Sequence, residues 1–217
     1  MRVSIGPGLE SLSGDLDLPA GARGVVAFAH GSGSSRTSPR NRFVAAQLRE
    51  GALGTLLIDL LTPGEEAVDA RTRHLRFDIE MLADRMVRVV DWLRKDEEAS
   101  QLSIGLFGAS TGAAAALIAA ARRPQVVGAV VSRGGRPDLA GSYLRDVAAP
   151  TLLIVGGRDA EVIELNRSAA ARISAPKRLT IVPGASHLFE EPGTLGEVAR
   201  LAREWFVQNL DNGKPDQ

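Results

Sequence analysis

Five residues in the middle of this chain, Gly108 to Gly112, constrain its fold more than any other feature. They read Gly-Ala-Ser-Thr-Gly and separate two runs of different character. Residues 102–107 are mostly apolar and have the length of a buried strand, whereas residues 113–122 are mostly alanine and predict a helix. A serine at such a strand-to-helix turn is typical of an exposed nucleophile, and its tight backbone leaves room only for glycine two residues away on either side. The motif therefore predicts a sheet covered by helices, with a reactive Ser110 at one strand end.

The rest of the chain alternates between the same two kinds of segment. Continuous apolar runs, which suit buried parallel strands, alternate with runs whose apolar residues recur at helical spacing. The expected strands are 25–29, 55–59, 102–107, 126–132, 151–155 and 179–182. The expected helices are 39–50, 73–95, 113–122, 137–147, 161–173 and 195–210. Residues 9–18 predict an edge hairpin arm, 61–72 a polar loop and 211–217 a frayed tail.

This alternation predicts an α/β fold with a mostly parallel central sheet and helices on both faces. We expect one domain over residues 1–217, since no internal repeat or composition shift marks a boundary. The interval between the strands expected at 126–132 and 151–155 is too short to build a large lid. An open site at the carboxyl ends of the strands follows from this arrangement.

Composition excludes several classes of function. Lys plus Arg and Asp plus Glu are balanced at 26 each, so no overall basic field would hold a nucleic acid. The absence of cysteine excludes disulfides, a thiol nucleophile and a zinc–cysteine site. The three histidines lack ligand spacing, so we expect no metal and no cofactor. No apolar window suits a membrane helix or a signal peptide, which favours a cytoplasmic protein. The oligomeric state is left between a monomer and a small homo-oligomer.

A nucleophilic serine needs a histidine as base, and the histidine needs an acid that orients it. His187 follows the last expected strand, and Asp159 follows the strand 151–155 after two glycines. Strand ends of a parallel sheet meet at one edge, so Ser110, Asp159 and His187 should lie together there. Their order along the chain predicts a catalytic triad.

Other interpretations stay open for these residues. Ser110 could be a helix cap and His187 an ordinary loop histidine. Asp159 could cap the helix that follows it, and the acid would then be Asp138, Glu161 or Glu164. His30 ends a strand and is expected to bond the loop it opens, while His74 is expected at the surface.

Three motifs together resemble the alpha/beta-hydrolase superfamily. They are Gly108-Ala109-Ser110-Thr111-Gly112, Gly156-Gly157-Arg158-Asp159 and Ala185-Ser186-His187. The small size without a lid resembles the dienelactone-hydrolase-like branch, although the namesake enzymes use a cysteine nucleophile and this chain offers a serine. The resemblance implies an oxyanion hole of two backbone N–H groups. One comes from Thr111, and the other comes from the loop after the early strand, where Ser32 matches best and Gly33 is the alternative.

These observations predict a serine carboxylic-ester hydrolase that acts on small or short-acyl esters through an acyl-enzyme. Ser110 would attack the ester, His187 would move the proton and Asp159 would orient His187. Lactone opening, acyl transfer or peptide cleavage by the same residues are alternatives. A non-catalytic binding module on the same fold is a further one. The expected partner is a small-molecule ester or lactone, with neither nucleic acid nor membrane involved.

Arginines gather in the loops at the expected site, namely Arg36, Arg40, Arg133 and Arg136. A guanidinium there would bind a carboxylate or phosphate on the substrate through paired hydrogen bonds. We expect Arg133 to do so first, because its strand end lies nearest the elbow strand, and Arg36 second. The competing interpretation is internal pairing, for example with Glu190 or Glu191, or simple solvation.

Overall fold

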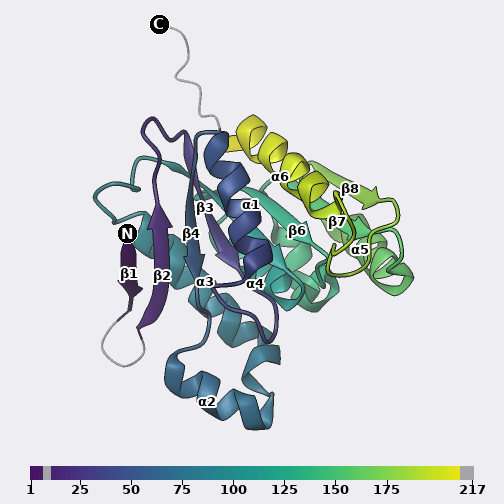
Figure 1. Ribbon diagram of the computed structural model, residues 1–217, viewed down its shortest axis with the longest axis horizontal. Helices are drawn as coiled ribbons and strands as arrows, with labels where there is room; N and C mark the ends of the chain where they lie inside the picture. Colours follow the sequence, from purple (N-terminus) through teal and green to yellow (C-terminus); the bar gives the residue numbers. More distant parts are fainter. Residues whose placement is uncertain (7–10, 211–217) are drawn as a thin grey trace, which may run out of the picture.

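An eight-stranded sheet forms the centre of the computed structural model, which describes residues 1–6 and 11–210 (Figure 1). The strands are β1 Arg2–Ile5, β2 Leu12–Asp17, β3 Gly24–Ala29, β4 Leu53–Ile58, β5 Ser103–Ala109, β6 Val127–Arg133, β7 Thr151–Gly156 and β8 Lys177–Val182. The α-helices are α1 Pro39–Glu50, α2 Pro63–Thr72, α3 Ile79–Leu93, α4 Thr111–Arg122, α5 Ala160–Arg172 and α6 Thr194–Leu210. Two 3₁₀ segments are η2 Leu75–Phe77 and η3 Pro137–Asp146. The predicted tail 211–217, and residues 9–10 of the predicted hairpin arm, lie outside the described residues.

The strand order β1-β2-β4-β3-β5-β6-β7-β8 brings the predicted site segments to one edge of the sheet. All neighbours from β4 to β8 pair in parallel, while β1 with β2 and β2 with β4 pair antiparallel. β3 and β5 lie side by side with Ala29 opposite Gly108, and β5 and β6 with Ala109 opposite Arg133. The loops after these three strands therefore leave the sheet at the same level. The predicted α/β fold with a mostly parallel sheet is confirmed, and it carries no large lid.

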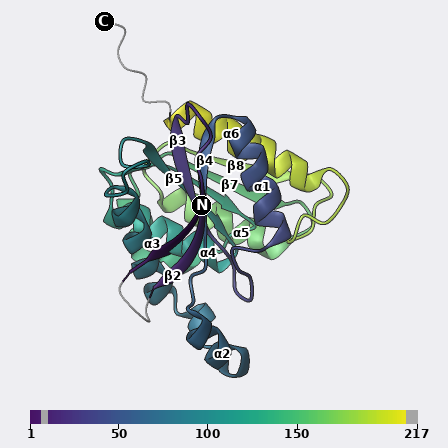
Figure 2. The same ribbon diagram turned by 60° about the vertical axis from the view of Figure 1, so that its left-hand side comes forward.

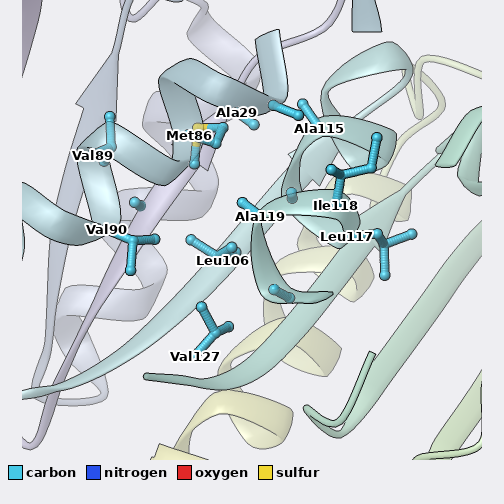
Figure 3. Packing of buried hydrophobic residues seen from close by; sticks show 14 of the residues in the cluster. Ala29, Met86, Val89, Val90, Leu106, Ala115, Leu117, Ile118, Ala119 and Val127 are labelled. Atoms are coloured by element: carbon cyan, nitrogen blue, oxygen red, sulfur yellow. The ribbon is translucent and has the colours of Figure 1, made fainter. Parts of the chain in front are cut away.

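Helices cover both faces of the sheet (Figures 1 and 2). α1 and α6 pack together on one face, whereas α3, α4 and α5 cover the other. On the second face, Figure 3 shows Met86 and Val90 of α3 near Leu106 of β5 and Ala119 of α4. All alanines of α4 except the partly buried Ala121 are buried, and their small size lets the helix lie close to the sheet. No helix of the described residues is long and apolar enough to cross a membrane.

The segment between β4 and α3 differs from the prediction. Residues 61–72 were expected to form a polar loop, but Pro63–Thr72 form α2. A capping box starts this helix, because the Thr62 hydroxyl accepts from the N–H of Glu65 at 3.3 Å and the Glu65 carboxylate accepts from the N–H of Thr62 at 2.8 Å. Proline at the first helical position favours the same start. These local signals outweigh the polar composition that suggested a loop.

The long helix expected over 73–95 is also divided. η2 covers Leu75–Phe77, and α3 begins only at Ile79. The carboxylate of Asp78 accepts from the N–H of Met81 at 3.0 Å and so caps α3. α2 projects from the lower side of the molecule in Figures 1 and 2.

Candidate active site

Ser110 occupies the sharp turn between β5 and α4. Its backbone has φ 49° and ψ −123°, a strained conformation for a residue with a side chain that costs about 1–3 kcal/mol. A Cβ at Gly108 would collide with the backbone of Ala113, and one at Gly112 would collide with the carbonyl oxygen of Ala29. The close contact of strand, turn and helix therefore requires both glycines and holds the serine in its strained position.

His187 and Asp159 come together at the ends of β8 and β7. Nδ1 of His187 lies 2.6 Å from Oδ2 of Asp159. A carboxylate at this position favours the tautomer with hydrogen on Nδ1, which leaves Nε2 able to accept a proton. Asp159 makes no side-chain capping bond to α5, so the cap interpretation of this residue is wrong.

Residues that competed for these roles have other partners. Asp138 accepts a hydrogen bond from Nε of Arg136 at 2.9 Å, and Glu164 pairs with Arg167. His74 is exposed, as predicted, and its ring is hydrogen-bonded to the hydroxyl of Thr72 at 2.8 Å. Among the described residues, the one carboxylate bonded to the His187 ring is that of Asp159.

His30 has the structural role that its position predicted. Its Nε2 accepts from the N–H of Leu60 at 3.0 Å, so Nδ1 carries the hydrogen and donates to the carbonyl of Gly31 at 2.9 Å. Burial lowers the pKa of His30, which favours this neutral ring. The two bonds fix the loop after β3 against the elbow, where a Cβ on Gly31 would lie 3.0 Å from the Cβ of Ser110.

Two cavities share Gly31, Ser32 and Ser34 of this loop in their walls. One, of about 250 Å³, has both Ser110 and His187 in its wall, and we call it the serine cavity. Its full lining is Gly31, Ser32, Ser34, Ser38, Arg40, Ala109, Ser110, Arg133, Gly134, His187 and Leu188. The other, of about 280 Å³, reaches α2, and we call it the α2 cavity. Its lining is His30 to Ser35, Leu61, Glu66, Asp69, Arg76, Leu82 and Thr111.

The two residues predicted to form an oxyanion hole both line the α2 cavity, and one of them also lines the serine cavity. Ser32 lines both, and Thr111 lines the α2 cavity next to Ser110. Thr111 is the first residue of α4, so its N–H has no acceptor within the helix and lies at the positive end of the helix dipole. Gly33, the alternative donor, lines the α2 cavity and not the serine cavity.

The arginines of the expected cationic rim differ in their partners. Three are paired with carboxylates, Arg36 with Asp59, Arg40 with Glu190 and Arg136 with Asp138. Arg36 also lies outside both cavity linings, so internal pairing accounts for it. The Arg133 guanidinium has no hydrogen bond or ion pair with any residue in the described part of the chain, although Arg133 is only 7% exposed. Burial lowers the pKa of Arg133 to about 10, and Arg40 acts in the same direction.

Two further residues that shape the site were not predicted from the sequence. Gly134 has φ 51°, and a Cβ there would lie 3.0 Å from the carbonyl oxygen of His187 and 3.7 Å from its Cε1. The backbone after β6 thus packs directly on the histidine. Glu191 accepts from the N–H of Ser186 at 3.0 Å and steadies the loop that carries His187. The Gly-Gly pair after β6 was a sequence signal for Gly134. The role of Glu191 had no such signal, because it depends on how the loop after His187 folds back on Ser186.

The described residues lack the side-chain clusters that bind metal ions. Within residues 1–6 and 11–210, no group of three or more His, Asp or Glu side chains is placed to hold a metal ion. Asp69, the buried carboxylate of the α2 cavity, is bound by the side chain of Arg76.

Comparison with known proteins assigns a family to this geometry. The sequence profile of the "Dienelactone hydrolase family" matches residues 60–209. The chain belongs to the dienelactone hydrolase family. A crystal structure of dienelactone hydrolase from Anabaena variabilis is 60% identical with a TM-score of 0.95, and 97% of each chain is covered. Est1E from Butyrivibrio proteoclasticus is 16% identical with a TM-score of 0.79 over 96% of this chain and 98% of that one, and so shares the fold. Family membership supports a hydrolase, and the predicted resemblance is confirmed.

A curated relative carries a different name. A "Putative phosphoribosyl transferase" of Mycobacterium tuberculosis is 56% identical over 209 residues. The match covers 96% of this chain and 46% of that protein, so the chain spans about half the length of the curated relatives it matches. The name describes that longer protein as a whole. It does not identify the chemistry of the half that resembles this chain.

Proposed function

We propose that this protein is a serine hydrolase that cleaves small carboxylic esters through Ser110, His187 and Asp159. One observation carries the proposal: a histidine bonded to a carboxylate at 2.6 Å shares a cavity with a serine held in a strained turn. A helix cap or a surface histidine would require neither the strain nor the shared cavity. Membership in a family of hydrolases supports the same conclusion.

The geometry supports a two-step reaction. Oγ of Ser110 attacks the ester carbonyl carbon while Nε2 of His187 takes the hydroxyl proton, and Asp159 stabilises the imidazolium through Nδ1. The N–H groups of Thr111 and Ser32 would stabilise the tetrahedral oxyanion by about 3–4 kcal/mol each. His187 then gives its proton to the leaving alcohol, which leaves an acyl group on Ser110. Water, deprotonated by His187, attacks this acyl-enzyme and releases the acid.

Lactone hydrolysis is a second candidate for the same residues. It is favoured by the 60% identity to a protein described as a dienelactone hydrolase. A lactone is a cyclic ester, so the attack is the same and the leaving alcohol stays attached to the acyl group. The chain has no cysteine, so Ser110 would perform the attack here as well.

A fluorophosphonate probe tests the nucleophile, because it forms a covalent bond with an activated serine and releases fluoride. We expect the wild type to be labelled and Ser110→Ala to be unlabelled. Ser35→Ala is the matched control, since it removes a nearby hydroxyl that lies outside the serine cavity, and it should be labelled like the wild type. Labelling of Ser110→Ala would reject the assignment, and an unlabelled wild type would favour a binding module. A panel of esters and lactones, compared by kcat/KM, then separates the two candidate reactions.

A further inference from the structure

The charge of the serine cavity is unbalanced. Arg133 reaches it from the end of β6, one strand away from the elbow, where the carbonyl of Arg133 accepts from the N–H of Ser110 at 3.4 Å. The side chain is more than nine-tenths buried, and its Nε has no hydrogen-bond partner. No Asp or Glu is among the described residues that line this cavity. A buried guanidinium without an acceptor destabilises the folded protein. The presence of one beside a nucleophile therefore points to a ligand that supplies the missing acceptor.

A second cation lies in the same cavity wall. Arg40 is in the first turn of α1, and its Nε is also buried without a partner. Its ion pair with Glu190 at 3.6 Å involves a carboxylate that is 62% exposed, so the pair is weak. Ser38, the N-cap of α1, lines the cavity as well, so the positive end of that helix adds to the two guanidinium charges.

These donors suit a phosphoryl group better than a carboxylate. One guanidinium already satisfies the two coplanar oxygens of a carboxylate. Here the donors come from a strand end, from a helix start and from Ser34 in the loop after β3. Three phosphoryl oxygens with up to two negative charges can accept from several directions at once and balance two cations.

We propose that the serine cavity binds a phosphoryl group carried by the substrate, with Arg133 as its main partner and Arg40 as the second. This inference rests on the proposed ester hydrolysis at Ser110. The substrate class is a small carboxylic ester whose acyl or alcohol part bears a phosphate monoester. The phosphate is a recognition group only, and the bond that breaks is the carboxylic ester bond.

Three matched acetate esters test the substrate class. Their alcohols are short chains that end in a phosphate, in a carboxylate or in a methyl group. We expect kcat/KM for the phosphorylated ester to exceed that for the neutral ester by about tenfold or more, the effect of one strong charged hydrogen bond. The carboxylated ester should fall between them. Equal values for all three esters, or a preference for the carboxylate, would overturn the phosphoryl assignment while leaving the esterase intact.

Arginine variants test which side chains cause the preference for the phosphorylated ester. Arg133→Met should bring the ratio of phosphorylated to neutral kcat/KM close to one, and Arg40→Met should lower it less. Arg42→Met is the matched control, because it removes a positive charge from the same helix outside the cavity, and it should keep the wild-type ratio. An unchanged ratio in both Arg133→Met and Arg40→Met would overturn the inference.

Inorganic phosphate distinguishes a failure of this inference from a failure of the proposed function. At constant ionic strength, phosphate should raise the Tm of the wild type and of Arg42→Met but not that of Arg133→Met. If no ester is hydrolysed and this pattern holds, the esterase proposal fails and the phosphoryl site stands. If phosphate binds through Arg133 but phosphorylated esters have no advantage, the cavity takes free phosphate and the substrate assignment is wrong. If esters are cleaved and phosphate has no effect on Tm, the phosphoryl site is wrong.

Discussion

The serine cavity and the α2 cavity share residues of one loop, yet their charges are arranged in opposite ways. The serine cavity has two arginines and no carboxylate among its described lining residues. The α2 cavity has the carboxylates of Glu66 and Asp69 and one guanidinium, Arg76, which is bound to Asp69. A buried charge that already has its partner is part of the fold. A buried charge without one marks the place where a ligand is expected.

The largest effect should come from the acid that orients the histidine. Asp159→Asn should lower kcat by about 10³–10⁴-fold, because an amide can hold the imidazole in the wrong tautomer and cannot stabilise its positive charge. Asp138→Asn is the control, since that carboxylate is bound to Arg136 and not to His187. Steady-state kinetics on one small ester measures both. A loss confined to Asp138→Asn would move the acid to that residue.

Opposite changes in stability should separate the two cavities. Arg133→Met removes an unpaired buried charge and should stabilise the protein by about 1–3 kcal/mol, or several degrees in Tm. Asp69→Asn removes the partner of Arg76 and a carboxylate that also accepts from the N–H of Leu75 at 2.8 Å, so its Tm should fall. Thermal denaturation in buffer free of phosphate gives both values. If both variants changed Tm in the same direction, the contrast between paired and unpaired charges would be lost.

A smaller effect concerns the length of the acyl chain. Each cavity holds less than about 300 Å³, enough for a short acyl group but not for a long one. Methylenes beyond the cavity would stay in water and add none of the roughly 0.8 kcal/mol that each buried methylene contributes. We expect kcat/KM to fall by about tenfold from butyryl to dodecanoyl esters of the same alcohol. A steady rise with chain length would show that α2 or another element moves to cover the chain.

The sequence predicted those features that depend on local signals. The glycines around Ser110 predicted the elbow, and apolar runs predicted six of the eight strands to within a few residues, since buried strands and sharp turns have short-range requirements. The capping box at Thr62 was a local signal too, but the polar composition of the segment concealed it. The contrast between Arg36 and Arg133 could not be predicted, because the two differ only in whether a distant carboxylate such as Asp59 lies within reach. Such pairing is set by tertiary structure.

The smallest effect should come from His30, which anchors the shared loop to the segment that follows β4. Its pKa is lowered chiefly by burial, whereas in the unfolded chain it stays near the ordinary value of 6.5. Below pH 6.5 the unfolded state therefore binds a proton that the folded state does not, and stability falls as the pH is lowered toward the folded pKa. At higher pH the two states bind equal numbers of protons at this site, so its contribution is constant.

This dependence can be measured without activity. Denaturant unfolding of the wild type between pH 7.5 and 5.5 should show a decline, and His30→Gln should show a shallower one at lower overall stability. His74→Gln is the control, because His74 is exposed and the change should leave the slope as in the wild type. A slope that His30→Gln leaves unchanged would mean that other groups cause the decline. The loop would then depend on its two hydrogen bonds, to Leu60 and Gly31, rather than on the neutrality of the ring.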